Sequence, residues 1–167
     1  MTEPALRRML DEQALRRLAE SYAHAVDRLD PELLVSLFTP DGVIEADFQF
    51  SETSLLTLVA SVTPNGMRIV GHDQIRAIPP MLGQRFKGTW HCVMNQTTTI
   101  DGDAAHGETY TLAHHLYEPE PGQLMTFDMA IRYQDRFVRG ADGWRFANRR
   151  LMIDWTRNTK VAVRAGT

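Results

Sequence analysis

The stretch KGTWHCVMNQTTTI, Lys87 to Ile100, decides how the rest of the chain is interpreted. It has the pattern of a β-strand, in which side chains alternate between two faces. One face then carries Thr89, His91, Val93, Asn95 and Thr97, and the other carries Trp90, Cys92, Met94 and Gln96. Both faces mix polar and apolar residues. The strand therefore lies at a polar edge of a sheet, or one of its faces lines a cavity that contains water and has a functional role.

Three more strand-like segments follow this one, and the four cover residues 89–100, 104–118, 124–139 and 144–155. They are separated by the turn sequences DGDAAHG, EPEPGQ and RGADGW, two of which contain the Asp-Gly pair typical of hairpins. Consecutive hairpins predict an antiparallel meander in the second half of the chain.

The first half is mainly helical in pattern. Apolar residues at mostly three- and four-residue steps predict one amphipathic helix from Ala5 to about Arg28: Leu6, Met9, Leu10, Leu15, Leu18, Tyr22 and Val26. Asp30 as N-cap and Pro31 at the first helical position predict a short second helix, and VIEADF predicts a strand. GHDQIRAIPPMLGQRF predicts a third helix that two prolines break or restart. Residues 49–70 fit a loop, a short helix or both.

Helices gathered first and strands gathered later indicate an α+β domain, a curved sheet with helices packed on one face. The chain has 167 residues, 43% of them hydrophobic and 23% charged, which fits a single domain over residues 1–167 with an ordinary core. No internal repeat or interdomain linker is evident.

Charge and cysteine content narrow the function classes. The net charge of −3 and the scattered basic residues argue against nucleic-acid binding. A single cysteine, Cys92, excludes an intramolecular disulfide and offers no thiol cluster for zinc. No window approaches the roughly 20 apolar residues of a membrane span, and the N-terminus has no apolar signal segment. We expect a cytoplasmic protein without membrane association.

Asp27 and His91 are the first candidates for chemistry. Asp27 lies beside the apolar stripe of the first helix, near a helix C-terminus where negative charge is disfavoured. A neutral imidazole whose other nitrogen bonds a carboxylate is a suitable general base. The alternatives are a solvated charge at a helix end for Asp27 and a satisfied strand histidine for His91.

His114 and Arg150 are further candidates. Adjacent histidines on a strand point to opposite faces, so only one of His114 and His115 points inward. No His-x-His pair or carboxylate triad accompanies them, so we assign no metal and no cofactor. Arg150 shares a strand face with aromatic residues, where it either pairs with a carboxylate or holds an anionic group in a cavity.

Four stretches together resemble the SnoaL-like branch of the nuclear transport factor two-like superfamily, in particular its scytalone dehydratase, hexachlorocyclohexane dehydrochlorinase and bile-acid dehydratase relatives. They are YAHAVDRLDPELLVSLFTPDGVI, VGHDQI, TWHCVMNQTTTIDGDAAHGETY and RYQDRFVRGADGWRFANRRLMIDW, in the order of that family. The resemblance spans nearly the whole chain and implies a cone-shaped α+β barrel, in which three N-terminal helices and a strongly curved mixed or antiparallel sheet enclose a cavity.

The resemblance also implies roles for residues. The helix Asp falls on Asp27, the strand His on His91 and the second histidine of the scytalone dehydratases on His114. Tyr22 occupies the position of a polar cavity residue, and Arg150 that of a cavity arginine. Some positions depart from scytalone dehydratase: Val26 stands where that enzyme has a tyrosine, and Ile131 and Tyr133 stand where it has Ser and Asn.

The expected function is that of a cofactor-independent lyase, most simply a dehydratase acting on a small hydrophobic or polycyclic molecule of polyketide-like or steroid-like type. His91, oriented by Asp27, removes a proton, and Arg150, His114 or Tyr22 stabilises the leaving group or the developing oxyanion. We also assign substrate contacts to Asn95, Tyr110, Tyr133 and Trp155. An isomerase or cyclase, or a non-catalytic binding module, are the alternatives.

The late strands also suggest an assembly. Trp90, Met94, Ile153 and Trp155 would form an outer sheet face more apolar than solvent favours. We expect a homodimer or homotrimer.

Overall fold

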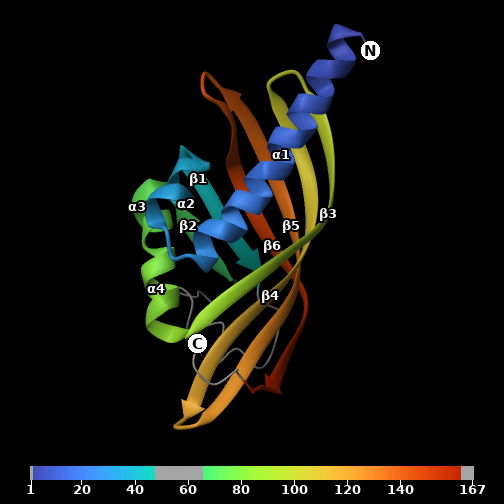
Figure 1. Cartoon of the computed structure of the whole chain (residues 1–167). Coiled ribbons are helices and arrows are strands. Elements are labelled where there is room, and N and C mark those ends of the chain that lie inside the picture. The colour runs from blue at the N-terminus through green and yellow to red at the C-terminus, as the bar shows by residue number, and fades with distance from the viewer. Residues whose placement is uncertain (1, 48–65, 163–167) are drawn as a thin grey trace.

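The computed structural model describes residues 2–47 and 66–162. Its described strands form one mixed, six-stranded sheet in the order β2-β1-β6-β5-β4-β3 (Figure 1). The strands are β1 (Phe38–Asp47), β2 (Met67–Val70), β3 (Gly88–Asp101), β4 (Ala104–Glu120), β5 (Gln123–Gly140) and β6 (Gly143–Lys160). The pair β1–β6 is parallel, and the other neighbouring pairs are antiparallel. The predicted α+β class and the antiparallel meander are confirmed.

Four helices are described: α1 (Glu3–Asp27), α2 (Pro31–Ser36), α3 (Gly71–Arg76) and α4 (Ile78–Arg85). The third predicted helix, which prolines were expected to break or restart, corresponds to α3 and α4, and these meet at Ala77 after the first two strands. The expectation for residues 49–70 falls mostly outside the described residues, and β2 forms its end. None of the described helices is long and apolar enough to cross a membrane.

The first helix lies diagonally across one face of the sheet, which we call the inner face, while the opposite face is the outer face (Figure 1). Its buried residues include Leu15, Leu18, Tyr22 and Val26, as the periodicity predicts. Leu6, Met9 and Leu10 were expected in the same apolar stripe but are about half exposed, at 43%, 56% and 56%. The core therefore lies under the second half of α1.

A buried carboxylate ties the first half of this helix to the sheet. Asp11 accepts two hydrogen bonds from Arg139, at 2.7 and 2.6 Å, and one from Trp144 Nε1 at 3.0 Å. The Arg139 guanidinium also lies over the Trp144 ring, with 4.3 Å between its central carbon and the ring centroid. These contacts fix α1 against the β5–β6 hairpin and so help to set the angle at which its far end reaches β3.

The second helix begins as the sequence predicts. Asp30 precedes it with extended backbone, and its side chain accepts a hydrogen bond of 2.9 Å from the Leu33 amide. Such a cap satisfies one of the unpaired amides at a helix start, and Pro31 needs no donor at that position. The chain therefore turns sharply after α1, and Leu34 and Val35 pack into the core.

Three of the register shifts in the long strands bear on the placement of the predicted site residues. In β3, Val93 pairs with Thr111 while Gln96 pairs with Thr109, so one extra residue is inserted among Met94 and Asn95. In β6, extra residues are inserted at Ala147 and at Asp154, because the partners in β5 advance by one residue where β6 advances by two. Each such bulge reverses which residues face inward beyond it.

Candidate active site

The carboxylate of Asp27 and the ring of His91 meet where the end of α1 crosses β3. The Asp27 Oδ1 atom lies 2.7 Å from His91 Nδ1, although the two residues are 64 positions apart. Oδ1 also accepts a hydrogen bond of 2.8 Å from the Thr89 hydroxyl, and Oδ2 accepts one of 2.9 Å from the His91 amide. Both side chains are largely buried, with 7% of the His91 side chain and 21% of the Asp27 side chain exposed.

These bonds explain how a carboxylate is kept at the C-terminal end of a helix. Burial acts to raise the pKa of Asp27, but the hydrogen bonds from the His91 ring, the His91 amide and the Thr89 hydroxyl outweigh it, and the pKa falls below its ordinary value. Asp27 is therefore ionised at neutral pH. Because a carboxylate only accepts hydrogen bonds, His91 Nδ1 carries the proton toward it, and Nε2 is the nitrogen that can take up another.

His91 faces a pocket between the inner face of the sheet, α1 and α4. Of the described side chains that line it, four are polar: Tyr22, His91, His115 and Tyr133. The rest of the lining is aliphatic or Met, and comprises Val26, Ile44, Met67, Ile69, Ile78, Leu82, Met129, Ile131, Leu151 and Ile153. The cavity has a volume of about 60 Å³, and one buried water needs roughly 10–15 Å³. It therefore has room for a few waters or a small polar group as the structure stands.

His115 is the second histidine of this pocket, and sequence reasoning had placed His114 there. The exposed fraction of His115 is 3%, its ring centroid lies 5.5 Å from that of His91, and its Nδ1 is buried without a hydrogen-bond partner among the described residues. Burial, reinforced by the charge that His91 can carry, lowers the pKa of His115 to about 3. His115 is thus a neutral imidazole at any physiological pH.

His114 lies on the outer face instead. Its Nδ1 is 2.9 Å from Asp128 Oδ1, and Arg157 donates a hydrogen bond of 2.9 Å to the other oxygen of that carboxylate. Strand alternation, which the sequence does show, required one histidine in and one out. Strand alternation does not show which of the two faces the helices cover.

Two of these bulges move two more predicted site residues away from the pocket. Asn95 is exposed, because the bulge in β3 turns Gln96 inward, where its amide donates to the Thr109 hydroxyl at 3.0 Å. Arg16 of α1 donates to the Met94 carbonyl that this bulge exposes. Arg150 is half-buried and does not line the pocket, because the bulge at Ala147 turns its neighbour Arg149 inward.

Of the other residues predicted to contact a substrate, some line the pocket and some lie on the outer face. Tyr22 and Tyr133 line the pocket, with 6% and 2% of their surface exposed. Tyr110 and Trp155 are on the outer face, 38% and 46% exposed. Ile153, predicted on that face, lines the pocket instead, because the bulge at Asp154 reverses the strand between it and Trp155.

Arg149 is the functional candidate that sequence reasoning missed. The exposed fraction of this residue is 1%, and its guanidinium makes two hydrogen bonds of 2.9 Å to Asp135. It also stacks on three aromatic rings, with its central carbon 4.2 Å from the Tyr22 centroid, 4.1 Å from Tyr133 and 4.3 Å from Phe146. The signal in the sequence was the adjacent pair Arg149 and Arg150. Strand alternation sends one of the two inward, but it does not show which one.

In the described part of the chain, no group of three or more His, Cys, Asp or Glu residues is placed to hold a metal ion. Cys92 is exposed on the outer face. The polar groups that the described residues bring to the pocket are one Asp-supported base, one neutral histidine and two phenolic hydroxyls in an apolar setting.

Comparison with known proteins gives a family and a set of structural neighbours. The sequence profile of the SnoaL-like domain matches residues 7–150. No curated protein matches the chain.

Among solved structures, a protein from Novosphingobium aromaticivorans DSM 12444 provisionally named a scytalone dehydratase is 24% identical. The match covers 95% of this chain and 92% of that one, with a TM-score of 0.69. A hexachlorocyclohexane dehydrochlorinase, LinA type 2, is 17% identical over 98% and 99% of the two chains, with a TM-score of 0.72. LinA type 3 from Novosphingobium barchaimii LL02 is 16% identical over 98% and 96%, with a TM-score of 0.71. At these identities the likeness establishes a shared fold.

Proposed function

Because the chain belongs to the SnoaL-like domain family, we propose that it is a cofactor-independent lyase, most simply a dehydratase. The observation that carries the proposal is the 2.7 Å contact between Asp27 and His91 at the edge of an apolar pocket. Two neighbours in fold bear the names of elimination enzymes, a dehydratase and a dehydrochlorinase, which supports the same class of reaction.

In the proposed reaction, His91 Nε2 takes a proton from a carbon next to an activating carbonyl. The electron pair of that C–H bond forms an enolate and then a C=C bond as the C–O bond of a β-hydroxyl breaks. The proton held by His91 passes to the departing hydroxyl, which leaves as water, so the enzyme returns to its starting state. Asp27 holds the His91 tautomer and stabilises the imidazolium between the two proton transfers.

Tyr22 and Tyr133 are the donors proposed for the enolate oxygen. Both hydroxyls belong to buried side chains that line the pocket, and their ring centroids are 5.7 Å apart in an edge-to-face arrangement. Burial raises the pKa of both phenols, so they remain protonated at neutral pH and can donate. Donors fixed in a water-poor site stabilise a developing oxyanion more than water does.

His115 is proposed as a neutral hydrogen-bonding partner for the departing hydroxyl. Because its pKa is about 3, the imidazolium is not populated at neutral pH, and His115 does not serve as a general acid. Its ring packs against Phe86 and Phe127, with centroid distances of 4.7 and 6.3 Å, which fixes its direction. A fixed neutral group with one buried unsatisfied nitrogen is suited to recognise a hydroxyl.

The lining also describes the substrate. Among the described residues that line the pocket there is no Lys, Arg, Asp or Glu, and burying an unpaired anion in such a lining is costly. We propose an uncharged, mainly hydrophobic ring compound with a ketone and a β-hydroxyl as its polar groups. Met67 and Met129 in the lining can change shape to admit a ring, because unbranched thioether side chains repack easily.

Isomerisation or ring closure is the second candidate reaction. It uses the same proton abstraction and oxyanion donors, and it is favoured because the described lining residues include no charged group that could hold a departing anion. The two reactions differ in outcome, since isomerisation moves a proton and retains every atom of the substrate.

The proposal is tested by screening cyclic β-hydroxy ketones and hydroxylated polycyclic compounds for the ultraviolet change that accompanies enone formation. In the His91→Ala protein we expect turnover to fall by about a hundred- to ten-thousand-fold, with ligand affinity and circular dichroism largely kept. The matched control is His106→Ala, which removes an exposed histidine at the far end of the sheet. Wild-type turnover in the His91→Ala protein, or ligand binding without turnover of any compound, would overturn the proposed lyase.

A further inference from the structure

The buried ion pair of Arg149 and Asp135, which lies behind the rings of Tyr22 and Tyr133, has no role in the reaction proposed above. Arg149 and Asp135 are cross-strand neighbours on β6 and β5, and 1% and 0% of their side chains are exposed. Arg149 does not line the main pocket, but it borders a narrow gap together with Tyr22, Tyr133 and His91. Its fork is held by Asp135, so it is not positioned to bind a leaving group itself.

A buried ion pair joins two strands at a large cost in desolvation. Removing both charges from water is costly, and apolar residues of similar volume often stabilise a fold as well or better. The arginine reaches the interior only because a bulge at Ala147 reverses the strand after Phe146. Cohesion of the two strands is therefore a weak reason for a buried cation at this position.

We propose that Arg149 is a positioning residue for the oxyanion site, where its guanidinium behind the rings of Tyr22 and Tyr133 strengthens the hydrogen bonds that their hydroxyls donate. A cation on the ring faces fixes both rings and attracts negative charge that develops on the phenol oxygens. Asp135 holds the guanidinium in plane. The inference rests on the proposed function only in placing an oxyanion at these two hydroxyls.

The causes that shift the pKa of the two tyrosines agree with a net positive effect of the ion pair. Burial is the main cause that raises the pKa of Tyr22, and Arg149 opposes it more strongly than Asp135 adds to it. For Tyr133 burial again dominates, and Arg149 again outweighs Asp135. The ion pair therefore acts on both phenols as a net positive group, although its total charge is zero.

Substituted phenols provide a test that needs no substrate, because a bound phenolate presents an oxyanion to the same donors. We would titrate the wild-type protein with a series such as 4-nitrophenol, 3-nitrophenol and 4-cyanophenol, and measure by visible or ultraviolet absorption the affinity and the ionised fraction of the bound phenol. The comparison protein is Arg149→Met with Asp135→Leu, which removes both charges together and leaves no buried unpaired ion.

We expect the double variant to stay folded, with a thermal midpoint at or above that of the wild type, and to bind phenolates about tenfold more weakly. In a Tyr22→Phe, Tyr133→Phe background the same charge removal should have no further effect on phenolate affinity, because Arg149 acts through the two hydroxyls. Arg149→Lys, which keeps the charge but not the planar stacking, should recover part of the affinity.

Three results would overturn the inference: unchanged phenolate affinity in the charge-free double variant, an equal loss in the background without the hydroxyls, or failure of the wild type to bind any phenol of the series at millimolar concentration. A merely structural pair would leave both the phenolate affinity and the ionised fraction unchanged in the charge-free variant, whatever happens to its thermal midpoint. Phenolate binding without turnover of any substrate would overturn the proposed lyase and leave this inference standing.

Discussion

Asp27 Oδ1 and His91 Nδ1 lie 2.7 Å apart, and the same carboxylate accepts hydrogen bonds from the His91 amide and the Thr89 hydroxyl. One side chain thus anchors the end of α1 to β3 and orients the imidazole. Because the backbone bond fixes the strand as well as the ring, the geometry of the candidate base is tied to the packing of the helix that carries Asp27.

Replacing Asp27 with Asn should separate the anchoring role from the chemical one. The amide keeps the shape of the side chain, but it cannot stabilise an imidazolium and its NH₂ group can force the wrong tautomer on His91. We expect kcat to fall by about a hundred- to ten-thousand-fold, measured on any substrate that the screen identifies. Asp73→Asn, on the exposed surface of α3, is the matched control and should keep wild-type kcat. An Asp27→Asn protein with unchanged kcat contradicts the role given to this carboxylate.

The adjacent histidines give a sharp test of the site. His115→Gln should lower turnover by about tenfold or more, because it removes the fixed neutral group inside the pocket. His114→Gln should leave turnover near wild type, because that ring lies on the outer face with Asp128. Both variants are compared by kcat and KM on the same substrate. The reverse ranking of the two variants would show that the pocket is not where the reaction occurs.

The stability of the protein should depend on pH through His115. Its pKa is about 3 in the folded state, and near 6.5 in an unfolded chain. Between these values the unfolded state binds more protons, so stability rises as pH increases to about 6.5 and is lost progressively as pH falls below it. We expect this residue to add a slope of about 1 kcal/mol per pH unit between roughly pH 4 and 6, measured by urea unfolding.

His115→Phe should remove that slope, because the replacement cannot gain a proton on unfolding. His106→Phe alters an exposed histidine and should leave the slope as it is in the wild type. Equal slopes in the His115→Phe and wild-type proteins would mean that His115 is accessible to protons in the folded state.

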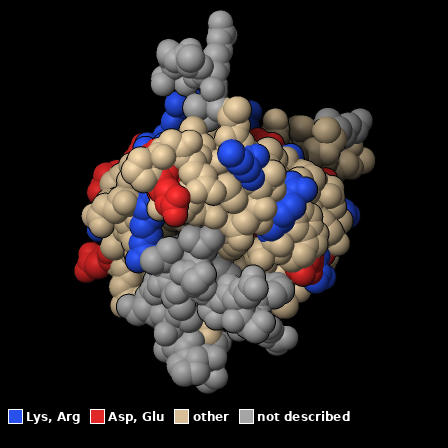
Figure 2. Space-filling view, turned by 90° about the horizontal axis from the view of Figure 1, so that it is seen from below, with Lys and Arg blue, Asp and Glu red and all other residues tan. Residues whose placement is uncertain are grey.

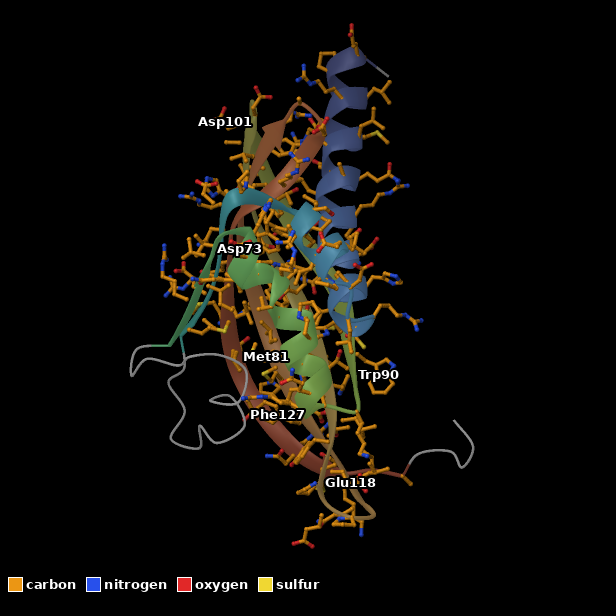
Figure 3. The ribbon with its side chains drawn as sticks, turned by 90° about the vertical axis from the view of Figure 1, so that its left-hand side faces the viewer. Asp73, Met81, Trp90, Asp101, Glu118 and Phe127 are labelled. Carbon is orange, nitrogen blue, oxygen red and sulfur yellow. The ribbon has the colours of Figure 1, made fainter. Side chains whose placement is uncertain are left out.

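The outer face of the sheet is expected to be covered by another copy of the chain. The exposed fractions of Trp90 and Trp155 are 55% and 46%, and that of Met94 is 40%. Trp90 projects outward from β3 (Figure 3). On the end of the molecule seen in Figure 2, by contrast, acidic and basic side chains are scattered among uncharged residues. Large apolar side chains gathered on one face favour association.

Sedimentation tests this expectation of a homodimer or homotrimer. Trp155→Glu should shift the protein toward monomer at micromolar concentration, because it replaces a large exposed apolar side chain of the outer face with a charged one. Leu10→Glu, at an exposed position on the first half of α1, serves as control and should not change the assembly. A wild-type protein that sediments as a monomer at micromolar concentration removes the idea.

Much of the fold follows from local pattern. The long helix, the Asp30 cap, the break near the paired prolines and the four long strands all correspond to observed elements. The strands extend a few residues beyond their predicted ends, to Glu120, Gly140 and Lys160, because ladder hydrogen bonds from neighbours continue pairing past the apolar pattern. The strand at 43–48 begins earlier, at Phe38, for the same reason.

The sequence by itself determined the residue types available for chemistry, the α+β class and the alternation that sends one of each adjacent pair inward, His114 or His115 and Arg149 or Arg150. Tertiary structure decided which one. An extra residue in β3 turned Asn95 outward, another in β6 exchanged Arg150 for Arg149, and the side of the sheet that the helices cover selected His115. These outcomes depend on register against a partner strand and on which face is buried, and both are set by contacts between residues far apart in the chain, which no local pattern encodes.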